Sequence, residues 1–149
     1  MIYAYQRRCA VCRLPFAELL DAAHIKADAD GGAANVTNGL ALCKIHHGAF
    51  DANILGISPD YVVHVRQSVL ETFDGPTLQH AIKEMNGERL RQLPAARGER
   101  PDRDLLAERS ETFQILIVLS RPADAIWDPS GLNSTEKTNP SCAFADWIS

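Results

Sequence analysis

The chain has 149 residues, 46% of them hydrophobic, and a formal net charge of −4 at pH 7. This length corresponds to about one domain, and the hydrophobic fraction is ordinary for a globular protein. No stretch reaches the roughly 18 apolar residues of a membrane span, and the N-terminus lacks the charged-then-apolar pattern of a secretory signal. We therefore expect no membrane partner and a cytoplasmic location, where thiols stay reduced and available for metal.

The negative charge bears on any binding of nucleic acid. Domains that bind nucleic acid are often basic, and this chain is not. Residues 1–70 contain equal numbers of basic and acidic residues, so the excess acid lies outside that segment. If the segment binds DNA, its non-specific affinity should be modest and sensitive to salt. A metal ion, a further domain or a partner would then have to offset the repulsion.

Residues 2–8 predict a short helix that leads into a pair of cysteines. Cys9 and Cys12 form a C-x-x-C pair, and Cys43 and His46 form a C-x-x-H pair further along. Two closely spaced pairs of soft ligands across a longer loop are typical of a tetrahedral structural zinc site. We predict that these four residues hold one structural zinc ion with no open position for water. The alternatives are a disulfide or a lone redox pair, which the second pair of ligands disfavours.

The segments between and after these pairs predict a strand, a loop, a strand and a helix. An apolar run at residues 19–25 reads as a strand, and His24 lies near its end. Residues 26–38 are a polar loop with a Gly-Gly pair, without the spacing or the lysine of a phosphate-binding P-loop. Residues 40–42 predict a second short strand, and residues 44–52 predict a helix.

Four residues in this stretch are candidates for chemistry on a phosphodiester. His47 and Asp51 are four residues apart, so an imidazole and a carboxylate share one face of the predicted helix and suit a divalent cation beside a phosphate. A lone histidine such as His24 is more often a packed core residue, but near a metal its imidazole could take a proton from water. Asn38 precedes Gly39 and is typical of a turn, although its amide could also orient the backbone at His24.

His24, Asn38 and His47, beside both zinc pairs, resemble the motif of the HNH endonuclease family. The segments AHI, DGG, NGLALC and HHGAFD are similar to bacterial HNH proteins of the restriction type. The resemblance implies an α+β fold, the ββα-metal or His-Me finger, with a structural zinc and short flanking strands and helices. It is strong for residues 7–66, weaker to about residue 112 and absent beyond.

The resemblance also implies a role for each residue at the positions of the motif. His24 would be the general base, and Asn38 would orient the loop. His47 would be a ligand of the catalytic cation, which is Mg²⁺ or another divalent ion. Asp51 would be a second ligand one helical turn on.

One position departs from the pattern of the family. Many HNH nucleases carry Asp, Glu or His immediately before the base as a further metal ligand, and this chain has Ala23 there. The metal shell would then be thin, or Asp21, water and substrate phosphate would complete it. The departure keeps open an alternative function, a zinc-knuckle module that binds nucleic acid without cutting it. A zinc domain for structure or protein interaction is a third possibility.

The chain beyond the motif predicts further short elements. Residues 53–57 and 61–66 predict two strands, and residues 76–86 have helical spacing. Residues 88–93 predict another short strand. Residues 94–104 are rich in proline and charge and predict a linker.

The composition changes again toward the C-terminus. Residues 105–113 predict a last helix, and residues 113–120 predict an extended, β-like run. The remaining residues show no pattern, and Cys142 among them has no nearby Cys or His to join in a zinc site. We expect three parts: an HNH nuclease domain with its zinc knuckle at 1–93 (core 7–66), a linker and helix at 94–113, and a tail at 114–149.

The predicted function is metal-dependent hydrolysis of DNA phosphodiester bonds, of the restriction type. HNH restriction enzymes usually carry a separate recognition domain, and this chain opens almost at the zinc knuckle. We therefore expect a separate recognition domain or subunit, in which case the chain is a truncated or split form.

Overall fold

The computed structural model describes residues 1–119, and describes side chains as far as residue 114. Among residues 1–119, no helix combines the length and the apolar character needed to cross a bilayer. The strands and helices are, in chain order, β1 (Leu20–His24), β2 (Gly39–Cys43), α1 (Lys44–Asp51), β3 (Leu55–Ile57), β4 (Val63–Val65), α2 (Gln67–Leu70), α3 (Pro76–Ala81) and α4 (Arg103–Leu119). Short 3₁₀ turns lie at Ala17–Leu19, Asp28–Asp30, Lys83–Met85 and Arg97–Glu99.

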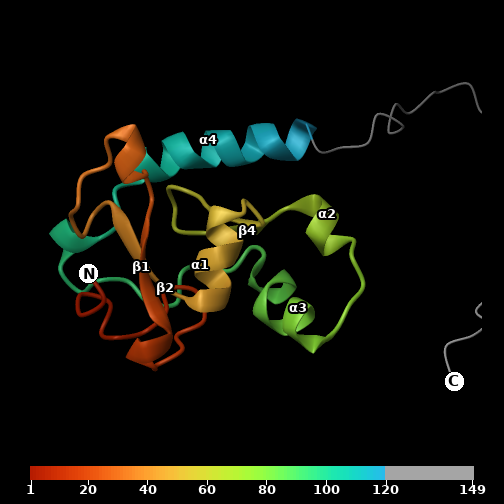
Figure 1. The fold of residues 1–149 in the computed structure, drawn as a ribbon, viewed down its shortest axis with the longest axis horizontal. Coiled ribbons are helices and arrows are strands. Elements are labelled where there is room, and N and C mark those ends of the chain that lie inside the picture. The colour runs from red at the N-terminus through yellow and green to blue at the C-terminus, as the bar shows by residue number, and fades with distance from the viewer. Residues whose placement is uncertain (120–149) are drawn as a thin grey trace, which may run out of the picture.

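The first sheet and the helix after it form a strand–strand–helix unit. β1 and β2 pair antiparallel, with Ala22 opposite Ala41 and His24 opposite Gly39. Every residue of β2 is buried. Helix α1 begins directly after Cys43 and packs on both strands (Figure 1). This is the predicted ββα arrangement, and the α+β fold class is confirmed.

The loop between β1 and β2 is tightly folded at its glycine pair. Gly31 has a φ of 80°, in the left-handed region that favours glycine. A Cβ on Gly32 would lie 2.0 Å from the carbonyl oxygen of Lys26 and 2.8 Å from the side-chain nitrogen of Asn38. The loop can therefore close on itself only with glycine at this second position.

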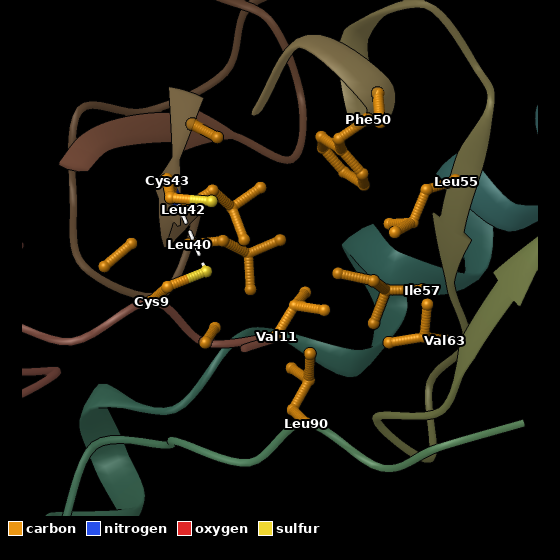
Figure 2. Packing of buried hydrophobic residues seen from close by; sticks show 14 of the residues in the cluster. Cys9, Val11, Leu40, Leu42, Cys43, Phe50, Leu55, Ile57, Val63 and Leu90 are labelled. Atoms are coloured by element: carbon orange, nitrogen blue, oxygen red, sulfur yellow. Dashed lines mark hydrogen bonds between the residues drawn. The ribbon is translucent and has the colours of Figure 1, made fainter. Parts of the chain in front are cut away.

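A second hairpin, β3–β4, extends the core beyond α1. Leu55 pairs with Val65 and Ile57 pairs with Val63. Helix α4 packs on β3, where the ring of Phe113 lies against Gly56. The shared core includes Val11, Leu40, Leu42, Phe50, Leu55, Ile57, Val63 and Leu90 (Figure 2). One hydrophobic core therefore joins the ββα unit to the hairpin.

Three predicted elements differ in the structure. Residues 2–8 form turns and no helix, because Gln6 and Arg7 have φ values of 54° and 55°. The helix predicted at 76–86 ends at Ala81 and is followed by a 3₁₀ turn. Residues 88–93 form no strand, because the N–H of Leu90 donates to Tyr61 whereas those of Arg91 and Gln92 donate to Ala10, and one isolated bridge remains.

The C-terminal elements also differ from the prediction. The extended run predicted at 113–120 is wrong as far as residue 119, because α4 continues to Leu119. A short apolar run cannot be told from a buried helix segment by periodicity alone. The proline-rich segment before α4 packs on the domain, where the backbone N–H of Asp102 donates to the carbonyl of Thr37 at 2.9 Å. The expected tail from 120 onward, with Cys142, lies outside the described residues.

Candidate functional site

The four predicted zinc ligands come together in one cluster. The ligand atoms of Cys9, Cys12, Cys43 and His46 all lie within 4.8 Å of one another. His46 Nδ1 is 3.1 Å from Cys43 Sγ and 3.6 Å from Cys9 Sγ. Cys12 Sγ is 4.0 Å from Cys43 Sγ. Because zinc binds sulfur at about 2.3 Å and imidazole nitrogen at about 2.0 Å, this cluster could hold one tetrahedral metal ion such as zinc.

The surroundings of the cluster orient its ligands. His46 is 1% exposed, and its Nε2 lies 2.8 Å from the carbonyl oxygen of Ala81. A proton on Nε2 satisfies that carbonyl and leaves the Nδ1 lone pair facing the sulfurs. The backbone N–H of Cys43 donates to Cys9 Sγ at 3.3 Å (Figure 2). The chain thus orients the histidine ring, so that Nδ1 faces the sulfurs, and supplies a donor to a sulfur before any metal binds.

The close approach of these groups shifts their pKa values. Hydrogen bonds with Cys12 and then Cys9 lower the pKa of the Cys43 thiol. Burial favours neutral His46, but the bonds to Cys43 and Cys9 outweigh it and raise its pKa to about 10. The metal-free cluster therefore favours thiolate beside imidazolium, and a metal ion has to displace the imidazolium proton.

A second cluster begins at the very next residue. His47 lies between two carboxylates: its Nδ1 is 3.2 Å from Asp21 Oδ2, and its Nε2 is 3.2 Å from Asp51 Oδ2. Lys44 forms an ion pair with Asp21. The hydrogen bond from Lys44, and then that from His47, holds the pKa of Asp21 below its usual value. The adjacent histidines His46 and His47 on α1 thus face two different clusters of side chains.

Asn38 is buried and closes the loop that follows His24. Its Oδ1 accepts from the backbone N–H of Lys26 at 2.9 Å. Its Nδ2 donates to the carbonyls of Lys26 at 3.0 Å and Ala33 at 2.9 Å. The carbonyl of Asn38 also accepts from the N–H of Ile25. Asn38 therefore holds the backbone after His24 in place, at Ile25 through its own carbonyl and at Lys26 through its side-chain amide.

His24 itself has no side-chain partner within residues 1–114. It is the last residue of β1 and is exposed to solvent. Its backbone pairs with Gly39. Among residues 1–114 no hydrogen bond or ion pair joins its side chain to His47 or Asp51, whereas His47 and Asp51 lie 3.2 Å apart.

One residue with contacts near the site, Arg109, is not predicted from the sequence. Arg109 on α4 donates from Nη2 to the carbonyl of Phe50 at 2.9 Å and from Nη1 to the carbonyl of Ile25 at 3.5 Å. Its guanidinium carbon lies 4.1 Å from the centroid of the Phe50 ring. No local pattern marks this arginine, because its partners lie 59 and 84 residues earlier in the chain.

Comparison with known proteins gives one family and one structural relative. Residues 9–58 match the family described as HNH endonuclease. No curated protein matches the chain. A solved structure described as a modification-dependent TagI restriction endonuclease is similar at a TM-score of 0.50 and 22% identity, over 74% of this chain and 35% of that one. At this identity the likeness is one of fold, and this chain corresponds to about a third of that endonuclease.

Proposed function

We propose, on the premise that this chain belongs to the HNH endonuclease family through residues 9–58, that it hydrolyses DNA phosphodiester bonds with a bound divalent cation. The observation that carries the proposal is His47, which lies 3.2 Å from Asp51 on the helix of a ββα unit. An imidazole and a carboxylate at this spacing suit a cation beside a phosphate.

The zinc-type cluster supports the site without taking part in the reaction. We assign Zn²⁺ to Cys9, Cys12, Cys43 and His46, which would supply four ligands and leave no open position for water. Because His46 and His47 are neighbours on α1, a metal held by the first fixes the position of the second. The role of this metal is structural.

His47 and Asp51 would hold the catalytic cation, Mg²⁺ in our assignment. When bound there, the cation supplies positive charge that stabilises the phosphate and the leaving oxygen. With Asp21 accepting from Nδ1 of His47, Nε2 is the nitrogen that would offer its lone pair to a cation beside Asp51. Asp21 therefore acts as the orienting partner of His47, in a chain that has Ala23 where the family often has a ligand.

His24 acts as the general base in this proposal. A phosphodiester resists hydrolysis because its anion repels nucleophiles and the alkoxide leaves poorly. The exposed imidazole of His24 takes a proton from a water molecule, whose oxygen attacks phosphorus in line as the bond from phosphorus to the leaving 3′ oxygen breaks. Asn38 keeps the backbone after His24 in place through its bonds to Lys26.

The DNA partner and the restriction-type role extend the proposal. The similar restriction endonuclease is described as modification-dependent, and the part shared with it is a minority of its length. We infer that selection of the DNA sequence or modification resides in another domain or subunit. The described nuclease unit would then cut whatever DNA is brought to it.

A plasmid-cleavage assay tests the proposal. Supercoiled plasmid, unmodified or methylated, is incubated with the zinc-loaded protein and Mg²⁺, Mn²⁺ or EDTA. Cleavage is expected with either cation and none with EDTA, and added Mg²⁺ should restore it. Absence of cleavage on every substrate, with DNA binding retained, would instead support the non-catalytic zinc-knuckle module that Ala23 keeps open.

A further inference from the structure

Helix α4 lies outside the matched family region yet is anchored beside the candidate site. It runs across the end of β1 and the C-terminal end of α1 (Figure 1). Leu106 is fully buried, and Lys26 forms an ion pair with Glu108 at 2.9 Å. The helix therefore has fixed contacts with the loop that follows His24.

Arg109 connects the two elements that carry the proposed chemistry. Ile25, whose carbonyl it contacts, directly follows His24 at the end of β1. Phe50, whose carbonyl it contacts, directly precedes Asp51 in the last turn of α1. A planar guanidinium has its N–H donors in a fixed fork, so two bonds from its two terminal nitrogens set the separation of their acceptors.

We propose that Arg109 is a positioning residue of the nuclease site, which sets the last turn of α1, and with it Asp51, relative to the end of β1 that carries His24. The inference rests on the proposed function for the identity of the site. Arg109 touches no reacting atom and acts through the backbone on either side of it.

The chemistry of the contact explains why an arginine stands here. Burial lowers the pKa of Arg109 and the charge of Asp51 raises it, but a guanidinium stays charged at any physiological pH. A positive charge at a helix C-terminus interacts favourably with the helix dipole. The ring of Phe50 adds a cation–π contact at 4.1 Å. A lysine would keep the charge but would lose the fork that reaches both carbonyls.

The lengths of the two hydrogen bonds of Arg109 predict whether cation binding or the step that depends on His24 is more sensitive to its loss. The bond to Phe50 is 2.9 Å and that to Ile25 is 3.5 Å, so the contact on the Asp51 side is the stronger one. Loss of Arg109 should therefore weaken binding of the divalent cation more than it slows the step that depends on His24.

The test compares Arg109→Met and Arg109→Lys with a matched variant on the same helix. Arg103 also stacks on an aromatic ring, that of Tyr61 at 5.1 Å, and pairs with Asp60 at 3.6 Å, away from the site. Arg103→Met thus removes a similar contact from α4 without touching β1 or α1. Each zinc-loaded protein is titrated with Mn²⁺ alone, and cleavage is measured against Mg²⁺ concentration.

Arg109→Met should weaken Mn²⁺ binding about 10- to 100-fold, the range typical for partners that orient metal ligands. It should raise the Mg²⁺ concentration for half-maximal cleavage by a similar factor, while the rate at saturating Mg²⁺ changes less. Arg109→Lys should be intermediate, and Arg103→Met should match the wild type in both. Normal Mn²⁺ affinity in a folded Arg109→Met protein would overturn the inference.

The design separates this inference from the proposed function. If Arg109→Met does not fold, normal Mn²⁺ affinity in Arg109→Lys overturns the positioning role. If the wild type binds Mn²⁺ but never cuts DNA, the proposed function fails while the comparison of affinities still decides on Arg109. A wild type that neither binds Mn²⁺ nor cuts would overturn both.

Discussion

His24 is set apart from the other candidate residues by its exposure and its free side chain. Replacing this exposed side chain with alanine removes no hydrogen bond or ion pair among residues 1–114. We expect His24→Ala to keep its zinc and its DNA affinity, and to cut DNA about 10²- to 10⁴-fold more slowly, as is typical when a general base is lost. Cleavage rate and zinc content are measured on the same preparation. A folded, zinc-loaded variant that cuts at the wild-type rate would place the base elsewhere.

The protonation of His46 predicts how zinc binding depends on pH. Its pKa of about 10 means that the metal-free imidazole is protonated at pH 7, and it loses this proton when Nδ1 binds a metal. Zinc binding should therefore release protons, and the apparent zinc affinity should rise with pH up to about pH 10. Calorimetry in buffers of different ionisation enthalpy measures the release. Zinc affinity that does not change between pH 6 and pH 8 would contradict this charge state.

The knuckle that carries Cys9 and Cys12 packs into the core, where Val11 is 2% exposed, and is hydrogen-bonded to the segments beside it. The N–H of Ala10 donates to the carbonyl of Ala41 on β2 at 2.7 Å, and Ala10 accepts from Arg91. A cluster of four metal ligands would join this segment to α1 far more strongly than these bonds, because metal binding in small sites is coupled to folding.

Cys12→Ala tests this element directly. We expect the variant to lose its zinc, as measured by metal analysis, and its cooperative thermal unfolding, as measured by circular dichroism. Cys142→Ala is the matched control, since Cys142 lies outside both ligand pairs in the sequence, and it should behave as the wild type. A Cys12→Ala protein that retains zinc at full occupancy would refute the assigned ligand set.

The ββα unit and the zinc-type cluster were predictable because their determinants are local. Ligand pairs with a spacing of three residues, an i and i+4 pair on α1 and a Gly-Gly turn all act within one element or one loop. The contacts of Arg109 were not predictable, since they depend on where a distant helix packs. The strand predicted at 88–93 was wrong for the same reason. Within that segment, N–H groups donate to two separate parts of the chain, and no local sequence pattern indicates this.

At the scale of the whole chain, helix α4, which ends the described region, also covers part of the buried interior. Phe113 is 4% exposed, and a Cβ on Gly56 would lie 2.8 Å from its ring. Removing a buried phenylalanine typically costs about 3 to 5 kcal/mol. Shortening the chain so that Phe113 is lost should therefore lower the stability of the fold more than it lowers the rate of DNA cleavage.

Two shortened chains test the predicted division of the sequence. A chain ending at residue 119 should keep its zinc and its cleavage activity, as expected if the tail lies outside the nuclease core. A chain ending at residue 112 loses Phe113 and should keep zinc but unfold at a lower temperature. Zinc content, melting temperature and plasmid cleavage are compared with the full chain. Loss of zinc in the longer of the two would make the tail part of the core.

The adjacency of His46 and His47 limits how this protein can change during evolution. An α-helix advances about 100° per residue, so one residue inserted between them would turn His47 and Asp51 together away from Asp21 on β1, while leaving the cysteine cluster in place. Asp21 would then lose its imidazole partner, and the two proposed cation ligands would face a different part of the fold. Insertions and deletions should accordingly be purged from the start of α1 in descendants of this gene, and tolerated far better in the loops beyond β4.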